Sequence, residues 1–148
     1  MLILPNDCLS EIQGHAERGY PDEVCGLLIG TREGEGEGEH ATVIACVAGR
    51  NVRTERTRTT YELDPRSFLE AERAAEARGC EVIGVYHSHP DHPAQASPTD
   101  RDAAWPGLHY LIVAIRNGRL EDQASFVLRD GEMRSEGLTM TMMKESLS

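Results

Sequence analysis

A short apolar stretch that leads into two histidines constrains this chain more than any other feature. Val82–Val85 is rich in β-branched residues, as is typical of a buried strand, and Gly84 permits close approach of a neighbouring backbone. Side chains of an extended chain alternate between two faces, so His87 and His89 should emerge on the same face. Pro90 has no N–H to donate to a ladder and should end the strand. Two imidazoles placed in this way can hold one metal ion.

The loop after the histidines can bring a carboxylate back to them. Ten residues separate His89 from Asp100, which is enough for the chain to fold back. Two histidines, one aspartate and an open position match a catalytic zinc site, which has three protein ligands and a place for water. Each half also has a plainer interpretation. The histidines fit ordinary core or surface positions, and Ser97-Pro98 fits a helix start with Ser97 as N-cap.

The complete spacing, His87-x-His89-x7-Ser97-x-x-Asp100, resembles the JAMM (MPN-plus) zinc metalloprotease motif at every defining position. That family pattern also requires a glutamate on an upstream strand. Residues 21–30 resemble the family's first strand, with Glu23 at the matching position. The resemblance covers about residues 5–128 and points to a small bacterial-type member.

The pattern of elements predicts one α/β domain over residues 1–148, with a mixed β-sheet flanked by helices. The resemblance implies the same fold, a JAMM/MPN architecture like that of cytidine deaminases. Expected helices cover residues 6–18, 65–78 and 98–105, and expected strands cover 23–30, 41–47, 61–63, 82–85, 108–115 and 124–128. Asn6-Asp7 should cap the first helix, and Asn117-Gly118 should turn a hairpin. Residues 139–148, which contain three methionines, are expected to be a loosely docked tail.

The composition narrows the possible partners and compartment. The formal net charge of −10 argues against nucleic acid and anionic membranes as partners. The N-terminus lacks the features of a signal peptide, and no apolar run is long enough to span a membrane. The four cysteines show no Cys-x-x-Cys spacing and are predicted to be free thiols. These features predict a cytoplasmic protein, whose oligomeric state the sequence leaves open.

Several residues have a plain interpretation beside a functional one. Residues 31–40 alternate glycine with glutamate and should form a solvated hairpin tip without chemistry. Cys25 should share a face with Glu23, and a small buried hydrophobic role is favoured over a ligand or nucleophile. His109 is predicted to be a packed strand residue, and His92 a solvated loop residue. The arginines of residues 49–60 fit either a charged edge strand or a docking surface for an acidic partner.

The resemblance implies the chemistry. His87, His89 and Asp100 would bind one Zn²⁺ per chain, Glu23 would act as general base and Ser97 would donate a hydrogen bond to the developing oxyanion. Together these roles predict an enzyme that hydrolyses amide or isopeptide bonds. The alternative is a catalytically inactive MPN scaffold, although no ligand is missing here. A zinc deaminase is discounted because the chain has no Cys-x-x-Cys pair.

The resemblance also implies the substrate, a ubiquitin-like or sulfur-carrier protein cut after its C-terminal glycine. Ubiquitin-chain cutters carry long insertions for which this chain has no room. An extended Gly-Gly tail is naturally held by β-augmentation, in which main-chain hydrogen bonds give affinity. The segment from Arg53 to Tyr61 is the expected edge strand for this pairing.

Overall fold

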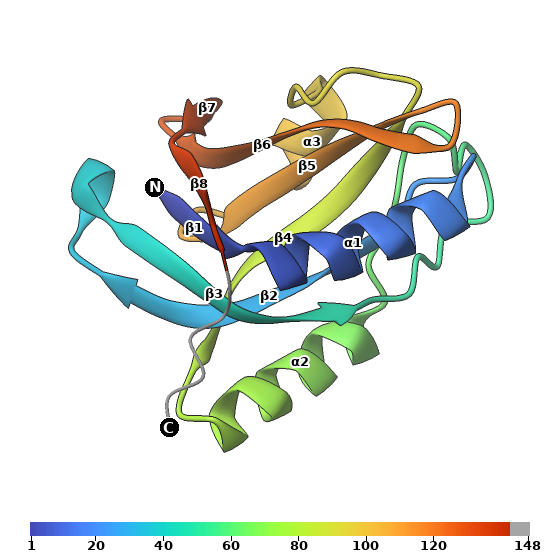
Figure 1. Ribbon diagram of the computed structural model, residues 1–148. Coiled ribbons are helices and arrows are strands. Elements are labelled where there is room, and N and C mark those ends of the chain that lie inside the picture. The colour runs from blue at the N-terminus through green and yellow to red at the C-terminus, as the bar shows by residue number, and fades with distance from the viewer. Residues whose placement is uncertain (143–148) are drawn as a thin grey trace.

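The computed structural model describes residues 1–142, in which eight strands form one mixed sheet with helices on both faces (Figure 1). The strand order across the sheet is β7-β6-β5-β4-β2-β3-β1-β8. The strands are β1 (Leu2–Pro5), β2 (Cys25–Glu33), β3 (His40–Ala48), β4 (Glu81–Pro90), β5 (His109–Arg116), β6 (Arg119–Arg129), β7 (Glu132–Glu136) and β8 (Leu138–Thr141). The helices are α1 (Asn6–Gly19), α2 (Pro65–Ala77) and α3 (Pro98–Ala103), with a 3₁₀ turn η1 (Gly36–Gly38).

Strand β4 lies near the centre of the sheet, antiparallel to β2 and parallel to β5. The expected need for Gly84 is confirmed, because a Cβ at this position would lie 2.3 Å from the carbonyl oxygen of His109. The strand is longer than predicted and includes both histidines, since its ladder with β5 continues to Pro90. It ends at Pro90, as expected.

Helices α1 and α2 cover opposite faces of the sheet (Figure 1). On one face, Ile12 and Ala16 of α1 pack with alternate residues of the central strands, such as Leu28 and Leu111. On the other, α2 packs through its alanines against a second set that includes Leu27 and Ile112. Burial of β2 on both faces is therefore confirmed, as is the predicted α/β fold with a mixed sheet.

The helix boundaries partly follow the predicted signals. Asp64 caps α2 by accepting a hydrogen bond from the Arg66 N–H at 2.9 Å, and Gly79 follows the helix with a φ of +68°. The predicted cap of α1 is wrong. That helix begins at Asn6 directly after β1, and its N-cap, Pro5, makes no side-chain cap. Helix α3 is shorter than expected and ends at Ala103.

The two ends of the described chain pair with each other. Strand β8 lies parallel to β1, and neither these strands nor β7 was expected from the sequence. The prediction of a loose tail is therefore wrong for residues 139–141, which belong to β8. Residues 143–148 of that tail lie outside the described part of the chain. None of the four cysteines, all within the described part, forms a disulfide.

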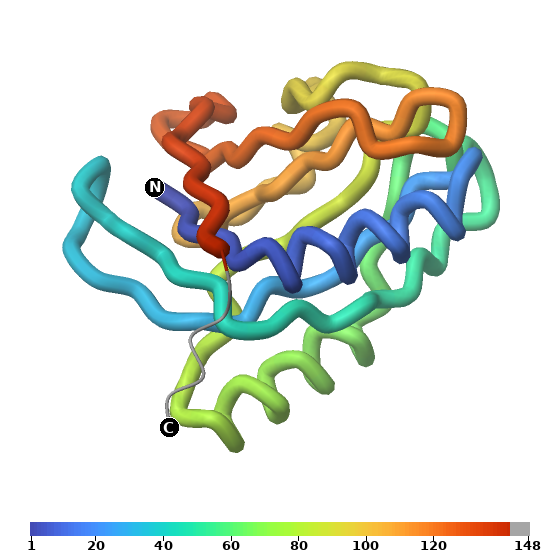
Figure 2. The backbone as a smooth tube through the Cα atoms, in the orientation of Figure 1, coloured from blue at the N-terminus to red at the C-terminus, as the bar shows by residue number. Residues whose placement is uncertain are grey.

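The segment predicted as an edge strand, Arg53 to Tyr61, is a loop. Its backbone contains turns, Arg56 has a φ of +55°, and the nearest ladder contact is a single bridge between Asn51 and Leu63. Figure 2 traces this green segment beside the connection from α1 to β2. Pairing of a substrate strand with residues 53–61 is therefore not available in this conformation, and the short strand expected at 61–63 is reduced to the Leu63 bridge.

Candidate active site

Strand β4 delivers both histidines to the face covered by α2. His87 and His89 are 0% and 7% exposed, and their Nε2 atoms lie 3.2 Å apart. Ser88 points to the other face, where its hydroxyl oxygen accepts a hydrogen bond from the Val24 N–H at 2.9 Å. The ladder with β2 ends at the pair Cys25–His87, so His89 has no partner strand on that side. The predicted alternation is confirmed, and the end of β2 leaves room beside His89.

Asp100 reaches the histidines from the first turn of α3. Its Oδ1 lies 3.1 Å from Nε2 of His87, and its Oδ2 lies 3.0 Å from Nε2 of His89. Ser97 and Asp100 form a capping box: the Ser97 hydroxyl accepts from the Asp100 N–H at 3.0 Å, and Oδ2 of Asp100 accepts from the Ser97 N–H at 2.9 Å. The capping box therefore also positions the Asp100 carboxylate that faces the two histidines.

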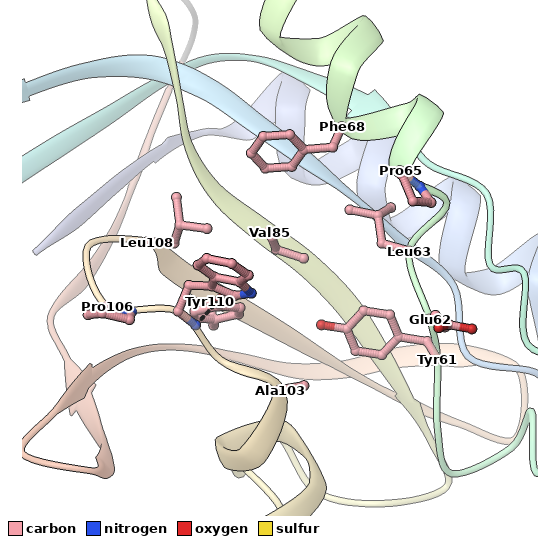
Figure 3. A pocket seen from close by; sticks show the side chains of 11 residues that line it. Tyr61, Glu62, Leu63, Pro65, Phe68, Val85, Ala103, Pro106, Leu108 and Tyr110 are labelled. Atoms are coloured by element: carbon pink, nitrogen blue, oxygen red, sulfur yellow. Dashed lines mark hydrogen bonds between the residues drawn. The ribbon is translucent and has the colours of Figure 1, made fainter.

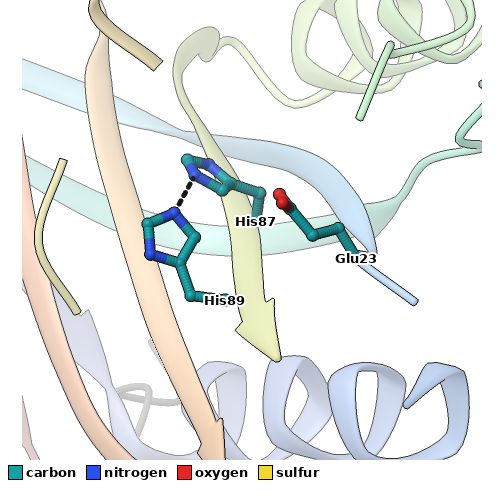
Figure 4. Close-up of side chains that lie close together, drawn as sticks. All are labelled: Glu23, His87 and His89. Carbon is teal, nitrogen blue, oxygen red and sulfur yellow. Dashed lines mark hydrogen bonds between the residues drawn. The ribbon is translucent and has the colours of Figure 1, made fainter. Parts of the chain in front are cut away.

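Glu23 occupies the space beside His89, two residues before β2 begins. The expectation that it lies within the strand is wrong, because its backbone pairs with a loop instead. Its N–H donates to the Thr57 carbonyl at 2.6 Å, and its own carbonyl accepts from Nδ2 of Asn51 at 3.1 Å. The carboxylate points toward the two imidazoles (Figure 4). Ligand atoms of Glu23, His87 and His89 lie within 4.8 Å of one another, a grouping that could hold a metal ion.

The site contains buried polar atoms whose hydrogen-bonding needs are not met. Among the described residues, the buried side-chain nitrogen and oxygen atoms without a partner are Oε1 of Glu23 and Nδ1 of His87. Burial raises the pKa of Glu23 to about 8. Most buried polar groups in proteins are paired, so an unpaired carboxylate oxygen facing two imidazoles indicates a place for a ligand.

The donor atoms fit a zinc ion. Ligand atoms around a tetrahedral zinc with bonds of about 2.0–2.1 Å lie about 3.3–3.4 Å apart. The nitrogen–nitrogen and nitrogen–oxygen distances here are 3.0–3.2 Å, close to that spacing. Nδ1 of His89 lies 2.9 Å from the Pro93 carbonyl, which can only accept. Nδ1 therefore carries a proton, which leaves Nε2 as the ring nitrogen that can bind a metal.

The pKa shifts of the two histidines differ. Burial would lower the pKa of His89, but its hydrogen bonds to Asp100 and to the Pro93 carbonyl outweigh this and raise it. Burial lowers the pKa of His87, which favours the neutral imidazole that binds metals. Burial alone would raise the pKa of Asp100, but its contacts with His87 and His89 hold that pKa well below its usual range. Cys25 is 1% exposed, and burial raises its pKa to about 12, so it stays a neutral thiol. This agrees with its interpretation as a small buried hydrophobic residue.

A cavity of about 740 Å³ adjoins the histidines on the same face of β4. Its apolar lining comes from the segment before α2, from α2 itself and from the α3–β5 connection (Figure 3), and includes Tyr61, Leu63, Phe68, Val85, Trp105 and Tyr110. Tyr61 belongs both to the cavity and to the histidine site, because its ring stacks on the His87 imidazole with centroids 4.6 Å apart. The sequence interpretation missed Tyr61 and Asn51; an aromatic ring in a polar segment just before a helix cap was the available signal.

Residues 5–130 match the family described as prokaryotic homologs of the JAB domain. The chain belongs to this family. A desampylase of Haloferax volcanii is 40% identical over 116 residues, which are 75% of this chain and 78% of the relative. A CysO-cysteine peptidase of Mycobacterium tuberculosis is 30% identical over 137 residues, 92% of this chain and 88% of the relative. The family predicted from the motif is thereby confirmed, and its named relatives are hydrolases.

Solved structures agree with the fold. Protein DSY2949 of Desulfitobacterium hafniense is 28% identical, with a TM-score of 0.85 over 99% of this chain and 97% of that one. AF2198, a JAB1/MPN domain protein of Archaeoglobus fulgidus, shares the fold with a TM-score of 0.55 over 94% of this chain and 99% of that one, at 18% identity. No helix of residues 1–142 is long and apolar enough to cross a membrane.

Proposed function

We propose that this JAB-family chain is a zinc peptidase that hydrolyses the amide bond after the C-terminal glycine of a ubiquitin-like, sulfur-carrier protein. The observation that carries the proposal is the buried Glu23 carboxylate, whose unpaired oxygen faces a close pair of imidazole nitrogens. A general base must be near its proton and must have a pKa near the working pH. A pKa of about 8 meets the second condition for Glu23.

Each residue of the site has a task in this proposal. His87, His89 and Asp100 hold the zinc ion, which when bound lowers the pKa of its water to about 7. Glu23 takes a proton from the attacking water and passes it to the leaving amine. Ser97 uses its hydroxyl oxygen as the acceptor in the α3 cap, so its hydrogen is available for the carbonyl oxygen as negative charge develops there.

Three features support the choice of substrate. The relatives described above are a desampylase and a CysO-cysteine peptidase by name. The apolar cavity, which shares Tyr61 with the site, can accept an apolar side chain that precedes the Gly-Gly end. The exposed arginines of the loop that holds Glu23, at positions 53, 56 and 58, would attract an acidic carrier protein.

The test uses a ubiquitin-like carrier protein with an extension beyond its Gly-Gly end. We expect one zinc per chain by metal analysis and a cut after the second glycine by mass spectrometry, and no cut when that glycine is replaced by leucine. Glu23→Gln keeps the shape of the side chain but cannot accept the proton, so turnover should fall roughly 10²–10⁴-fold with zinc retained.

Two other outcomes would contradict different parts of the proposal, namely the substrate and the enzymatic activity. A zinc-loaded protein that ignores the glycine replacement acts on a different amide bond. A protein that neither binds zinc nor cuts is the inactive scaffold.

A further inference from the structure

The two metal-site imidazoles are held in different ways. A histidine that binds a metal through Nε2 usually donates its Nδ1–H to an acceptor, which fixes the ring orientation. His89 follows this rule through the Pro93 carbonyl at 2.9 Å. His87 does not, because its Nδ1 is buried without a hydrogen-bond partner. Some other contact must therefore fix the orientation of the His87 ring.

The Tyr61 ring makes that contact. Its centroid lies 4.6 Å from the centroid of His87, with 27° between the ring planes, which is a stacked geometry. Stacked pairs of rings have a preferred separation and orientation, so the tyrosine restricts rotation of the imidazole about its side-chain bonds. The other imidazole, His89, lies at 53° to His87 and offers no such parallel surface.

Tyr61 is itself anchored to the rest of the site. The side-chain oxygen of Asn51 accepts hydrogen bonds from the N–H groups of Arg53 and Glu62, both at 3.0 Å. The Nδ2 group of the same asparagine donates to the Glu23 carbonyl at 3.1 Å. Asn51 thus connects the backbone next to Tyr61 with the backbone of Glu23. The Tyr61 side chain also forms part of the cavity wall, and its hydroxyl points into the cavity (Figure 3).

We propose that Tyr61 is a positioning residue, whose stacked ring holds the His87 imidazole in the metal-binding orientation in place of a hydrogen-bond acceptor on Nδ1. The proposal rests on the proposed function in one respect, namely that His87 is a zinc ligand. It assigns the aromatic ring, and not the phenol hydroxyl, as the group that matters. Removing an outer contact of a metal ligand typically weakens metal binding 10–100-fold.

The test compares zinc affinities, measured by competition with a chromophoric chelator, together with the absorption spectrum of the Co²⁺ form. Tyr61→Met keeps an apolar side chain of similar size but removes the ring, and it should bind zinc about 10–100-fold more weakly than the original chain. Tyr61→Phe keeps the ring and should restore both affinity and spectrum. Phe68→Met is the matched control, because Phe68 lines the same cavity and is not stacked on His87. It should leave zinc affinity unchanged.

The outcomes separate this inference from the function on which it rests. If the original chain binds zinc but Tyr61→Met binds it equally well, Tyr61 does not position His87 and only this inference fails. The same holds if Tyr61→Phe is as weak as Tyr61→Met, because the hydroxyl would then be the important group. If the original chain binds no zinc, the proposed function itself fails. Should Tyr61→Met not fold, Tyr61→Leu against Phe68→Leu provides the same comparison.

Discussion

Two clusters of histidine and carboxylate side chains, each built around buried histidine, differ in how completely they are paired. One is the candidate active site around His87 and His89. The other surrounds His109, whose Nδ1 lies 2.6 Å from Glu136 and whose Nε2 lies 2.7 Å from Glu39. The clusters lie at different places along the β4–β5 pair, since His109 is opposite Gly84 at its first pair, whereas His89 is opposite Ala114 near its last.

The clusters also lie on opposite faces of the sheet. His109 has the same alternation as Leu111, which packs in the core covered by α1, whereas His87 shares the face of the α2 core. In the His109 cluster, the carboxylates have further partners: Glu136 accepts from the Ser125 hydroxyl at 2.7 Å, and Glu39 pairs with Arg32 at 3.0 Å.

The difference separates a structural cluster from one with the features proposed for a functional site. Every ring nitrogen of His109 is paired within the protein, so the cluster can stabilise the fold without a ligand. In the active site, Glu23 and His87 each keep a buried atom without a partner. A buried polar group without a partner destabilises the folded state. Such a site is understandable when a ligand or substrate completes it.

The largest difference between the two clusters should appear when His87 and His109 are each replaced by leucine. His87→Leu removes a proposed zinc ligand, so zinc binding and turnover should be lost. The metal-free protein should lose less stability than the His109 variant described below, because the substitution removes a buried nitrogen without a partner together with one contact to Asp100, which keeps its contact with His89. The measurements are metal content, turnover, and urea unfolding in the presence of EDTA. Full zinc occupancy in this variant would remove His87 from the ligand set.

His109→Leu should have the opposite effect. It leaves Glu39 and Glu136 facing an apolar group. Breaking a fully buried ion pair costs about 3–5 kcal/mol, and the cost here should be smaller because the Glu39 side chain is 21% exposed. Zinc affinity and turnover of the folded protein should be unchanged. The measurement is the free energy of unfolding. The control is His40→Leu, because His40 is exposed on β3, and exposed substitutions usually change stability by no more than about 0.5 kcal/mol. Equal stability of both variants would mean that the His109 cluster contributes nothing to the fold.

The candidate active site was more predictable from sequence than the His109 cluster. His87, His89 and Asp100 lie close together in the chain, and strand alternation and a helix cap determine their relative placement. His109 lies in β5 and Glu136 in β7, whereas Glu39 lies between η1 and β3. Glu39 was part of a glycine–glutamate run that was expected to be solvated, and nothing local distinguishes it from its neighbours. Its role arises only in the folded molecule, because β3, β5 and β7 are not neighbours in the sheet.

The strands that the sequence did not predict have a common property. β7 and β8 are short and mostly polar, and β1 has only four residues, so none shows a clear apolar alternation. Each of these strands forms because a neighbouring strand of the sheet has backbone N–H and C=O groups with which it can pair. Conversely, Arg53–Tyr61 has the composition of an edge strand but forms a loop, whose backbone bonds go to Glu23 and to the Asn51 side chain. The local sequence pattern does not show which residues far away in the chain will form these hydrogen bonds.

Ser97→Ala sharpens the distinction within the active site, because Ser97 has both a structural contact and a proposed catalytic one. Loss of the cap should cost about 1 kcal/mol of stability. Loss of the hydrogen bond to the oxyanion should reduce turnover on the order of 10²-fold with zinc retained. Ser97→Thr keeps a hydroxyl cap and should recover both. If turnover in Ser97→Ala falls only with the folded fraction, Ser97 is a cap alone.

The smallest expected effect is a pH dependence of stability that belongs to the His109 cluster. Burial lowers the pKa of His109, but its hydrogen bonds to Glu136 and Glu39 outweigh this, and the net pKa is raised above 6.5. The stabilisation is therefore fully present below pH 6.5 and is lost as the pH rises through the pKa of the folded state. The pKa values of Glu39 and Glu136 are lowered from 4.5, despite burial, by hydrogen bonds to His109, so on the acid side stability is lost as the pH falls below 4.5.

The relevant measurement is the difference in unfolding free energy between the original chain and His109→Leu, taken in EDTA at a series of pH values. Contributions from the other titrating groups, including the active-site histidines, are common to both proteins and cancel in this difference. The difference should be largest between pH 4.5 and 6.5 and should shrink at higher pH. It should not vanish, because a neutral imidazole still donates one hydrogen bond to a carboxylate. A difference that is constant from pH 6 to about 10 would show that His109 keeps one protonation state throughout, and the cluster would then stabilise the fold by packing and not by charge.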